Sequence, residues 1–315
     1  MKNNELKQEI LRLKRERNAV ILGHYYQQHE IQELSDYVGD SLALAQEAQR
    51  TQADTIVFCG VHFMAETAKI LNPGRRVLLP DLKASCSLAE SCKADDFARF
   101  KAQHPDHIVI SYINCSAEIK ALSDLICTSG NAEKLVRSLP MEQKIIFAPD
   151  RNLGGYINQV TGRDMLLWNG VCTVHDAMQA EAVLSLKASY PQASVIAHPE
   201  CNPALLAVAD FVGSTKAMLS YITQSPSRQF IVATETGILY EMRRLCPNKE
   251  FLTLRDNKNC ACDDCAYMKL NTLEKLYLCL RDLQPEITME PAMIEAAARP
   301  IVRMLDLSRQ LGIIK

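Results

Sequence analysis

Short apolar runs alternate with amphipathic segments along nearly the whole chain. In order, the runs are AVILGHYY, TIVFCG, RRVLLPD, HIVISYIN, DLICTSG, KIIFAPD, ASVIAHPE, DFVGST and QFIVATE. Apolar strands separated by helices are typical of parallel sheets that are covered by helices on both faces. The pattern therefore predicts an α/β protein, with one helix from about Ile31 to Arg50 between the first two strands.

These runs form three versions of one unit, each with three strands and intervening helices. The first strands end at His24, Tyr112 and His198, which lie 88 and 86 residues apart. The third strand of each unit ends in an acidic residue, and a cysteine follows at a variable distance. The acids are Asp81, Asp150 and Glu235, and the cysteines are Cys86, Cys172 and Cys265. A repeat that keeps both features in phase argues against chance.

The repeat predicts how the units are arranged. Ligands of open α/β sheets bind beyond the carboxyl ends of parallel strands, near helix N-termini. We therefore expect three α/β/α units with parallel sheets in a pseudo-three-fold arrangement around a central active site. The expected units are residues 1–86, 87–172 and 173–269, and the C-terminal helices in 270–315 are expected to complete the first unit.

Composition excludes several classes of protein. The chain has 315 residues, of which 48% are hydrophobic and 23% charged, as in ordinary globular proteins. A formal net charge of −2 provides no basic field for nucleic acid. The N-terminal stretch is charged and amphipathic, unlike a signal peptide, and no apolar run approaches the roughly 20 residues that span a bilayer. We expect a cytoplasmic protein with no nucleic-acid or membrane partner.

Twelve cysteines are many for such a chain. In a reducing compartment they serve packing, catalysis or metal binding rather than disulfides. Cys59, Cys127, Cys246 and Cys279 occur in strand-like or helix-like segments and are expected to be buried. Cys86, Cys172 and Cys265 lie in loop contexts. If these three thiolates converge, they could hold zinc, a 4Fe–4S cluster with one open iron, or nothing.

Three expected helix starts carry small polar residues that suit an anionic ligand. They are Asp40-Ser41, Ser129-Gly130-Asn131 and Gly213-Ser214-Thr215. Free N–H groups and the helix dipole favour negative charge there, although a lone serine at such a place is more often a plain N-cap. Their recurrence in equivalent positions favours a substrate rich in negative charge.

Residues suited to acid–base chemistry follow the first strand of each unit. Side chains two positions apart on a strand share a face, so three pairs would line one cavity. The pairs are His24 with Tyr26, Tyr112 with Asn114, and His198 with Glu200.

The motifs GHYYQ, SYIN, TSGN, PDRNLGGYI, AHPEC, VGST, ATETGILYEM and CAYMKLNTLEKLY together resemble bacterial quinolinate synthases, in the same order and over nearly the whole chain. The resemblance implies a 4Fe–4S cluster with one open iron, held by Cys86, Cys172 and Cys265. It implies a transferase that condenses iminoaspartate with dihydroxyacetone phosphate, giving quinolinate, phosphate and water for NAD biosynthesis. An L-aspartate oxidase or dehydrogenase would supply the iminoaspartate.

The resemblance also implies roles for single residues. For the catalysis of this reaction we expect Glu200 to be the proton shuttle, with His24, Tyr26, Tyr112 and His198 as positioning or acid–base partners. The implied substrate-binding residues are His24, Ser41, Tyr112, Ile113, Asn114, Ser129, His198, Pro199, Glu200, Ser214 and Thr215, with Met268 as a further candidate. Where some family members have C-x-x-C-x-x-C, this chain has Cys260, Cys262 and Cys265, which leaves the role of Cys260 and Cys262 open.

Three other classes remain compatible with the residues. A hydro-lyase of the aconitase type would use the same open iron on hydroxy acids. An iron–sulfur sensor would not need the polar pairs around a cavity. A structural zinc protein would be colourless.

Overall fold

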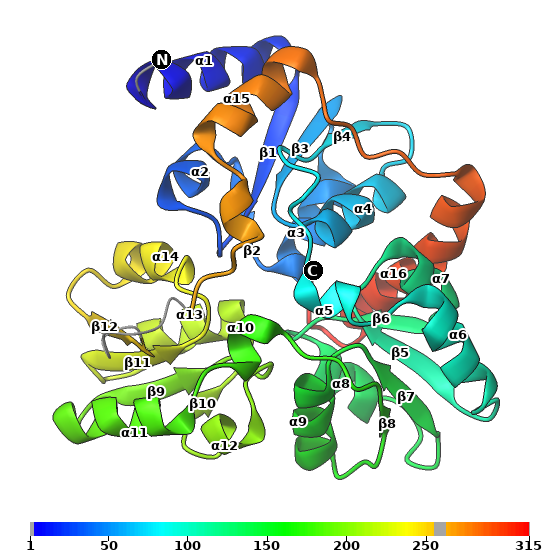
Figure 1. Cartoon of the computed structure of the whole chain (residues 1–315), viewed down its shortest axis with the longest axis vertical. Helices are drawn as coiled ribbons and strands as arrows, with labels where there is room; N and C mark the ends of the chain where they lie inside the picture. Colours follow the sequence, from blue (N-terminus) through cyan, green and yellow to red (C-terminus); the bar gives the residue numbers. More distant parts are fainter. Residues whose placement is uncertain (1–2, 255–262, 315) are drawn as a thin grey trace.

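The computed structural model describes residues 3–254 and 263–314 and contains three parallel four-stranded sheets. The predicted fold class, three α/β/α units around a common centre, is confirmed (Figure 1). The first sheet contains β1 (Ala19–His24), β2 (Tyr37–Gly39), β3 (Thr55–Cys59) and β4 (Arg76–Leu78). The second contains β5 (Ile108–Tyr112), β6 (Leu125–Cys127), β7 (Ile145–Ala148) and β8 (Leu166–Leu167). The third contains β9 (Ser194–Ala197), β10 (Phe211–Val212), β11 (Gln229–Ala233) and β12 (Glu250–Thr253).

Each sheet has the same strand order, with the second strand of the unit at one edge, followed by the first, the third and the fourth. The helices before the second sheet are α1 (Asn3–Glu16), α2 (His29–Leu34), α3 (Ser41–Arg50), α4 (His62–Leu71), α5 (Ser87–Glu90) and α6 (Ala94–Ala102). Next come α7 (Ala117–Leu122), α8 (Ala132–Arg137), α9 (Arg151–Thr161), α10 (Thr173–Asp176) and α11 (Ala180–Ser189). The remainder are α12 (Pro203–Leu206), α13 (Thr215–Gln224), α14 (Ile238–Leu245), the 3₁₀ turn η2 (Met268–Leu270), α15 (Leu273–Asp282) and α16 (Pro291–Gln310).

An aspartate joins the first two strands of every unit in the same way. Its carboxylate accepts the backbone N–H of a residue in the first strand, and its own N–H donates to the carbonyl of that residue. The pairs are Ile21 with Asp36, Val109 with Asp124 and Val195 with Asp210, with carboxylate contacts of 2.8, 2.8 and 2.7 Å. In each unit the partners are 15 residues apart. This contact sets the register of a short edge strand that has few ladder bonds of its own.

The segment from Ile31 to Arg50 corrects the sequence analysis. The expected single helix is instead α2, the strand β2 and α3. β2 has only three residues and only one of them is buried, so it lacks the apolar run that identifies a strand. Its place in the sheet depends on Asp36, a contact that hydrophobic periodicity does not reveal.

Because β2 was not predicted, the strands expected as the second and third of the first unit are in fact its third and fourth strands, β3 and β4. Each unit has four strands, and the cysteines follow the fourth strand rather than the third. Asp81 likewise follows β4, whereas Asp150 and Glu235 do follow third strands. The recurrence of one cysteine per unit is unaffected.

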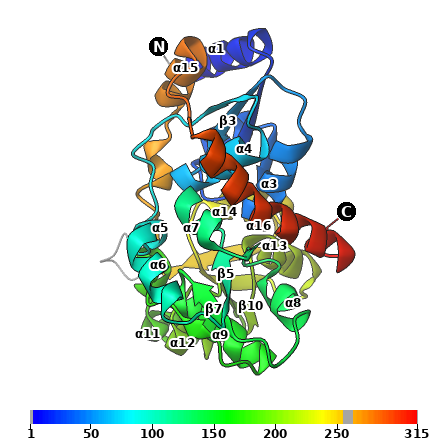
Figure 2. The same ribbon diagram turned by 90° about the vertical axis from the view of Figure 1, so that its right-hand side faces the viewer.

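The C-terminal helices join different parts of the chain. α15 packs beside α1 over one face of the first sheet, through residues such as Ile10, Leu276 and Leu280. α16 crosses from α4 to α7 and lies against β6 (Figure 2). One continuous apolar core contains residues of all three sheets, among them Ile56, Phe147 and Phe230. The division of the chain into units at residues 86/87 and 172/173 stays a prediction.

The cysteines expected in the core are there: Cys59, Cys127, Cys246 and Cys279 are all buried. Cys260 and Cys262 lie outside the described residues. Within the part of the chain that is described, no helix combines the length and the apolar character needed to cross a membrane.

Candidate active site

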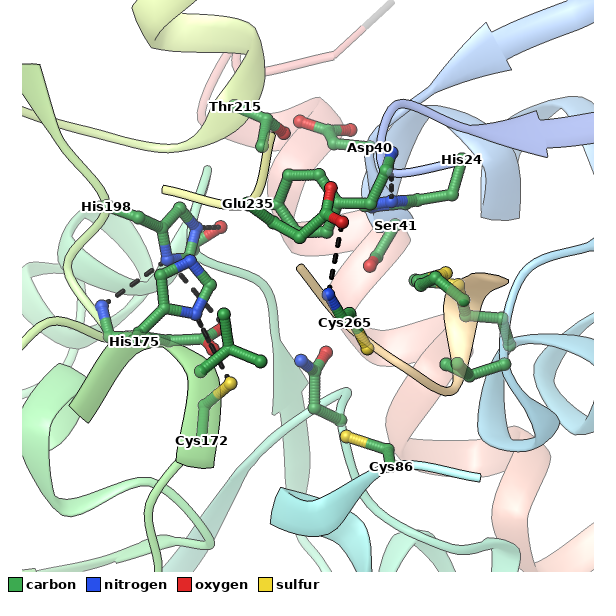
Figure 3. A pocket seen from close by; sticks show the side chains of 18 of the residues that line it. His24, Asp40, Ser41, Cys86, Cys172, His175, His198, Thr215, Glu235 and Cys265 are labelled. Carbon is green, nitrogen blue, oxygen red and sulfur yellow. Dashed lines mark hydrogen bonds and ion pairs between the residues drawn. The ribbon is translucent and has the colours of Figure 1, made fainter. Parts of the chain in front are cut away.

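A cavity lies at the centre, where residues that follow the strands of all three sheets meet (Figure 3). Most of the predicted site residues line it: His24, Tyr26, Ser41, Tyr112, Asn114, Ser129, His198, Glu200, Thr215, Cys86, Cys172, Cys265 and Met268. Ile113, Pro199 and Ser214 are not among the lining residues. Ile113 is in the apolar core, and the hydroxyl of Ser214 caps α13 by accepting the N–H of Ala217. The three polar pairs thus meet in one cavity, although β1, β5 and β9 end at His24, Tyr112 and Ala197. The second members, Tyr26, Asn114 and Glu200, lie beyond the strands.

Three cysteines differ from all the other described ones. Cys86, Cys172 and Cys265 are partly exposed and line the cavity, whereas the remaining described cysteines are buried. Each precedes a short helical turn. Burial raises the pKa of the Cys86 thiol to about 12, against the opposing effect of the N–H groups of Ala89 and Leu88.

The other two thiols repeat this arrangement. Burial raises the pKa of Cys172 and of Cys265, and backbone N–H groups oppose the rise in both. The N–H groups belong to His175 for Cys172, and to Met268 and Tyr267 for Cys265. Each sulfur therefore has amide donors two or three residues further along the chain, an arrangement that stabilises thiolates and metal-bound sulfur.

The two strand-end histidines are held in the same tautomer. Nδ1 of His24 accepts the N–H of Tyr26 at 3.1 Å, and Nδ1 of His198 accepts the N–H of Glu200 at 3.4 Å. Burial lowers the pKa of both imidazoles to about 3. Both rings are therefore neutral at pH 7, with the proton on Nε2. Nε2 of His198 lies 3.3 Å from the hydroxyl of Ser129.

Glu200 is 4% exposed and has a partner on each carboxylate oxygen. The hydroxyl of Tyr112 donates to Oε1 at 2.5 Å, and Nδ1 of His175 lies 3.1 Å from Oε2. Burial alone would raise the pKa of this carboxyl group, but His175 and the hydrogen bond from the Tyr112 hydroxyl lower it below its usual value. Glu200 is therefore an ionised, internally partnered carboxylate in the cavity wall.

Comparison with known proteins decides the family. The family model described as quinolinate synthetase A protein matches residues 8–306. The chain belongs to the quinolinate synthase family. A curated quinolinate synthase of Microcystis aeruginosa is 60% identical over 299 residues, which cover 95% of this chain and 94% of the relative. One from Synechocystis sp. is also 60% identical over the same shares. One from Chloroherpeton thalassium is 58% identical over 306 residues, 97% of this chain and 95% of the relative.

The sequence analysis missed one residue at the centre of this quinolinate synthase cavity. His175 lies one helical turn after Cys172, with Nδ1 3.3 Å from the sulfur. Its Nε2 lies 2.9 Å from the hydroxyl of Thr234, which in turn contacts the Tyr26 hydroxyl at 2.8 Å. The sequence does place His175 three residues after Cys172. That spacing puts the two side chains on one face only if the segment is helical, which the sequence did not indicate.

Glu235 was predicted as a strand-end acid, and the structure places it in the cavity wall next to the cysteine-bearing turn of the third unit. Its carboxylate accepts the N–H of Cys265 at 3.1 Å and the N–H of Gly237 at 2.7 Å. Lys269 pairs with it at 2.7 Å and also donates to the carbonyl of Tyr26. Glu235 therefore connects β11, the Cys265 turn and the first unit. Figure 3 shows its contact with Cys265.

The N-termini of α3 and α13 form another part of the wall. Ser41 and Thr215 are the first residues of α3 and α13, and both line the cavity. The carboxylate of Asp40 caps α3 by accepting the N–H of Ala43. Oδ1 of Asn114, also in the wall, is buried and has no hydrogen-bond partner among the described residues. It can accept a hydrogen bond from a ligand.

Proposed function

We propose that this quinolinate synthase family member condenses iminoaspartate with dihydroxyacetone phosphate in the cavity described above, releasing quinolinate, phosphate and two waters for NAD biosynthesis. The observation that carries the proposal is the convergence of one cysteine from each unit on a cavity that also holds neutral histidines and an ionised glutamate. The overall reaction is redox-neutral, so the site has to bind anions and move protons rather than electrons.

The three cysteines fit a 4Fe–4S cluster. They are free thiols from three separate turns, each with amide donors beside its sulfur. Cys86, Cys172 and Cys265 would hold the cluster and leave one iron without a protein ligand. That iron would supply Lewis-acid activation of a substrate oxygen or nitrogen.

The protein's own groups would bind the negative charges of both substrates. Carboxylates and phosphate fit the N-termini of α3 and α13, where Ser41 and Thr215 add hydroxyl donors. The Nε2–H groups of His24 and His198 can donate to substrate oxygens without adding positive charge. The free Oδ1 of Asn114 would accept the imine or enamine N–H. Tyr26 and Met268 complete the wall.

Glu200 would move protons during isomerisation and dehydration. It is ionised and can therefore take a proton from carbon or oxygen, and Tyr112 can return one through the hydrogen bond that joins the two side chains. Carbon–nitrogen closure joins the substrate nitrogen to a terminal carbon of the triose, which becomes an aldehyde when the ketone of dihydroxyacetone phosphate isomerises. Water leaves in this step, so no lysine of the enzyme is needed.

Two further proposals concern the surroundings of the enzyme. Iminoaspartate would come from the oxidation of L-aspartate, which requires an oxidase or a dehydrogenase as the supplying enzyme. A cytoplasmic location would keep the free thiols reduced.

The test is an anaerobic assay of quinolinate formation from the two substrates, with iron and sulfide analysis of the same sample. We expect a brown protein that fades in air and about four irons per chain. Cys265→Ser should remove both the cluster and the activity, whereas Cys279→Ala should keep both and cost only packing energy. A colourless, fully active protein with stoichiometric zinc would overturn the cluster assignment. Dehydration of hydroxy acids without condensation would favour the hydro-lyase alternative.

A further inference from the structure

Cys172, His175 and Glu200 form a second set of possible metal ligands within the cavity. One donor atom from each lies within 4.8 Å of the other two. Nδ1 of His175 is 3.3 Å from Sγ of Cys172 and 3.1 Å from Oε2 of Glu200. Ligand atoms around a tetrahedral Zn²⁺, at bond lengths of about 2.0–2.3 Å, are separated by between about 3 and 4 Å. The set is therefore close to the spacing that such an ion requires.

Contacts behind these ligands already orient them. Nε2 of His175 lies 2.9 Å from the Thr234 hydroxyl, which can accept the imidazole proton when Nδ1 exchanges its contact with Glu200 for a bond to an ion. The Tyr112 hydroxyl occupies Oε1 of Glu200 and leaves Oε2 for the ion. Metal-binding histidines and carboxylates in proteins are usually supported in this way by outer hydrogen bonds.

Charge favours a cation at this place. The side chains of His175 and Glu200 are 3% and 5% exposed, and Cys172 is half-buried. A Cys172 thiolate and the Glu200 carboxylate would lie within 4.8 Å of each other and would repel each other without a cation. A divalent ion would neutralise both charges, and its binding would release the thiol proton.

We propose that the cluster-free protein binds one tetrahedral divalent ion of the zinc class through Sγ of Cys172, Nδ1 of His175 and Oε2 of Glu200. A water molecule would fill the fourth position. Where Cys172 also serves the cluster, a role that rests on the proposed function, the ion and the cluster exclude each other. Zinc then blocks cluster assembly and withdraws Glu200 from proton transfer until a chelator removes it.

The first experiment titrates anaerobic, cluster-free, full-length protein with Co²⁺, whose absorption reports tetrahedral geometry and the number of thiolate ligands. We expect one Co²⁺ per chain with the spectrum of a single thiolate. Cys86→Ser should leave this spectrum unchanged. His175→Gln should abolish it, because glutamine can retain the contact with Thr234 but has no ligand atom in the place of Nδ1. Loss of the cobalt spectrum in Cys86→Ser would instead place the ion among the three cysteines and overturn the proposal, as would the absence of one-to-one binding.

A milder variant, Thr234→Val, tests the same ligand in case His175→Gln does not fold. Thr234→Val removes only the outer partner of His175 and should weaken Co²⁺ binding by about 10- to 100-fold. Unchanged affinity would contradict the orienting role of Thr234 and with it the proposed ligand His175.

A second experiment separates this proposal from the function proposed above. Preloading with Zn²⁺ should slow reconstitution of the cluster, followed by its absorption, in the wild-type protein and not in His175→Gln. If no cluster ever forms but Co²⁺ binds as expected, the proposed function fails and the metal site stands. If the cluster forms equally fast with and without Zn²⁺, the exclusion is wrong.

Discussion

The hydroxyl of Tyr112, at the end of β5, donates a 2.5 Å hydrogen bond to Glu200, three residues beyond the end of β9. The two residues are 88 positions apart and belong to different sheets. Both are buried, at 4% exposure each. The bond therefore joins two units across the cavity and holds the carboxylate in place as an acceptor.

Replacing Tyr112 with Phe removes this donor and leaves Oε1 of Glu200 without its closest partner. A hydrogen bond to a charged group contributes about 1.5–3 kcal/mol, so we expect kcat to fall by about 10- to 100-fold. Steady-state kinetics would measure this fall in kcat. The cluster content of the same samples would show whether the cluster is retained. Tyr25→Phe is the matched control, because Tyr25 does not line the cavity and its loss of a hydroxyl should leave kcat unchanged. Equal effects of the two changes would argue against the role of the bond.

Glu200→Gln preserves the shape of the side chain but removes its charge and its ability to take a proton. We expect the cluster absorption to remain and turnover to fall by about 10²- to 10⁴-fold, the usual contribution of a general acid–base group. Quinolinate formation measured under anaerobic conditions tests this. Substantial turnover in the variant would assign proton transfer to another residue.

Glu235→Gln leaves Lys269 without its buried partner and weakens the support of the Cys265 backbone. Loss of one member of a buried ion pair costs about 3–5 kcal/mol, and the partial exposure of Lys269 puts the expected cost near the lower value, about 3 kcal/mol. Denaturant unfolding would measure it, and iron content should fall as well. Asp81→Asn removes the partner of Lys275 in a more exposed pair and should cost no more than about 1 kcal/mol.

Asp124→Ala removes the carboxylate that accepts the N–H of Val109 and so loosens β6 at the edge of its sheet. We expect a decrease of about 1–3 kcal/mol in the free energy of unfolding, since the backbone N–H of Val109 loses its partner. Substrate KM should also rise, because Ser129 lies only two residues beyond the end of β6. Asp106→Ala, which breaks the surface contacts of Asp106 with Lys144 and His107, is the control and should change neither quantity. If Asp124→Ala and Asp106→Ala have the same free energy of unfolding, the contact between Asp124 and Val109 does not stabilise the sheet.

The sequence by itself was sufficient to predict the three-fold repeat and to identify the polar residues that follow its strands. Runs such as HIVISYIN are apolar enough to be strands buried on both faces. The recurrence of Cys86, Cys172 and Cys265, one per unit, holds although the prediction lacked one strand in each unit: β2, β8 and β12. Alternation along an extended chain is a local property. It predicted that His24 and Tyr26, like His198 and Glu200, face one cavity, and they do, but turns after β1 and β9 rather than strand alternation orient Tyr26 and Glu200.

Only the tertiary structure decided which of these groups touch. The strand β2 pairs with β1 next to the bond between Asp36 and Ile21, and His175 belongs to the site because one helical turn brings it from Cys172 to Glu200. Such contacts join residues from separate elements, and local patterns carry no information about them. The sequence thus determined the fold class and the chemical groups available, and the packing of three sheets around one cavity decided their partners and their charges.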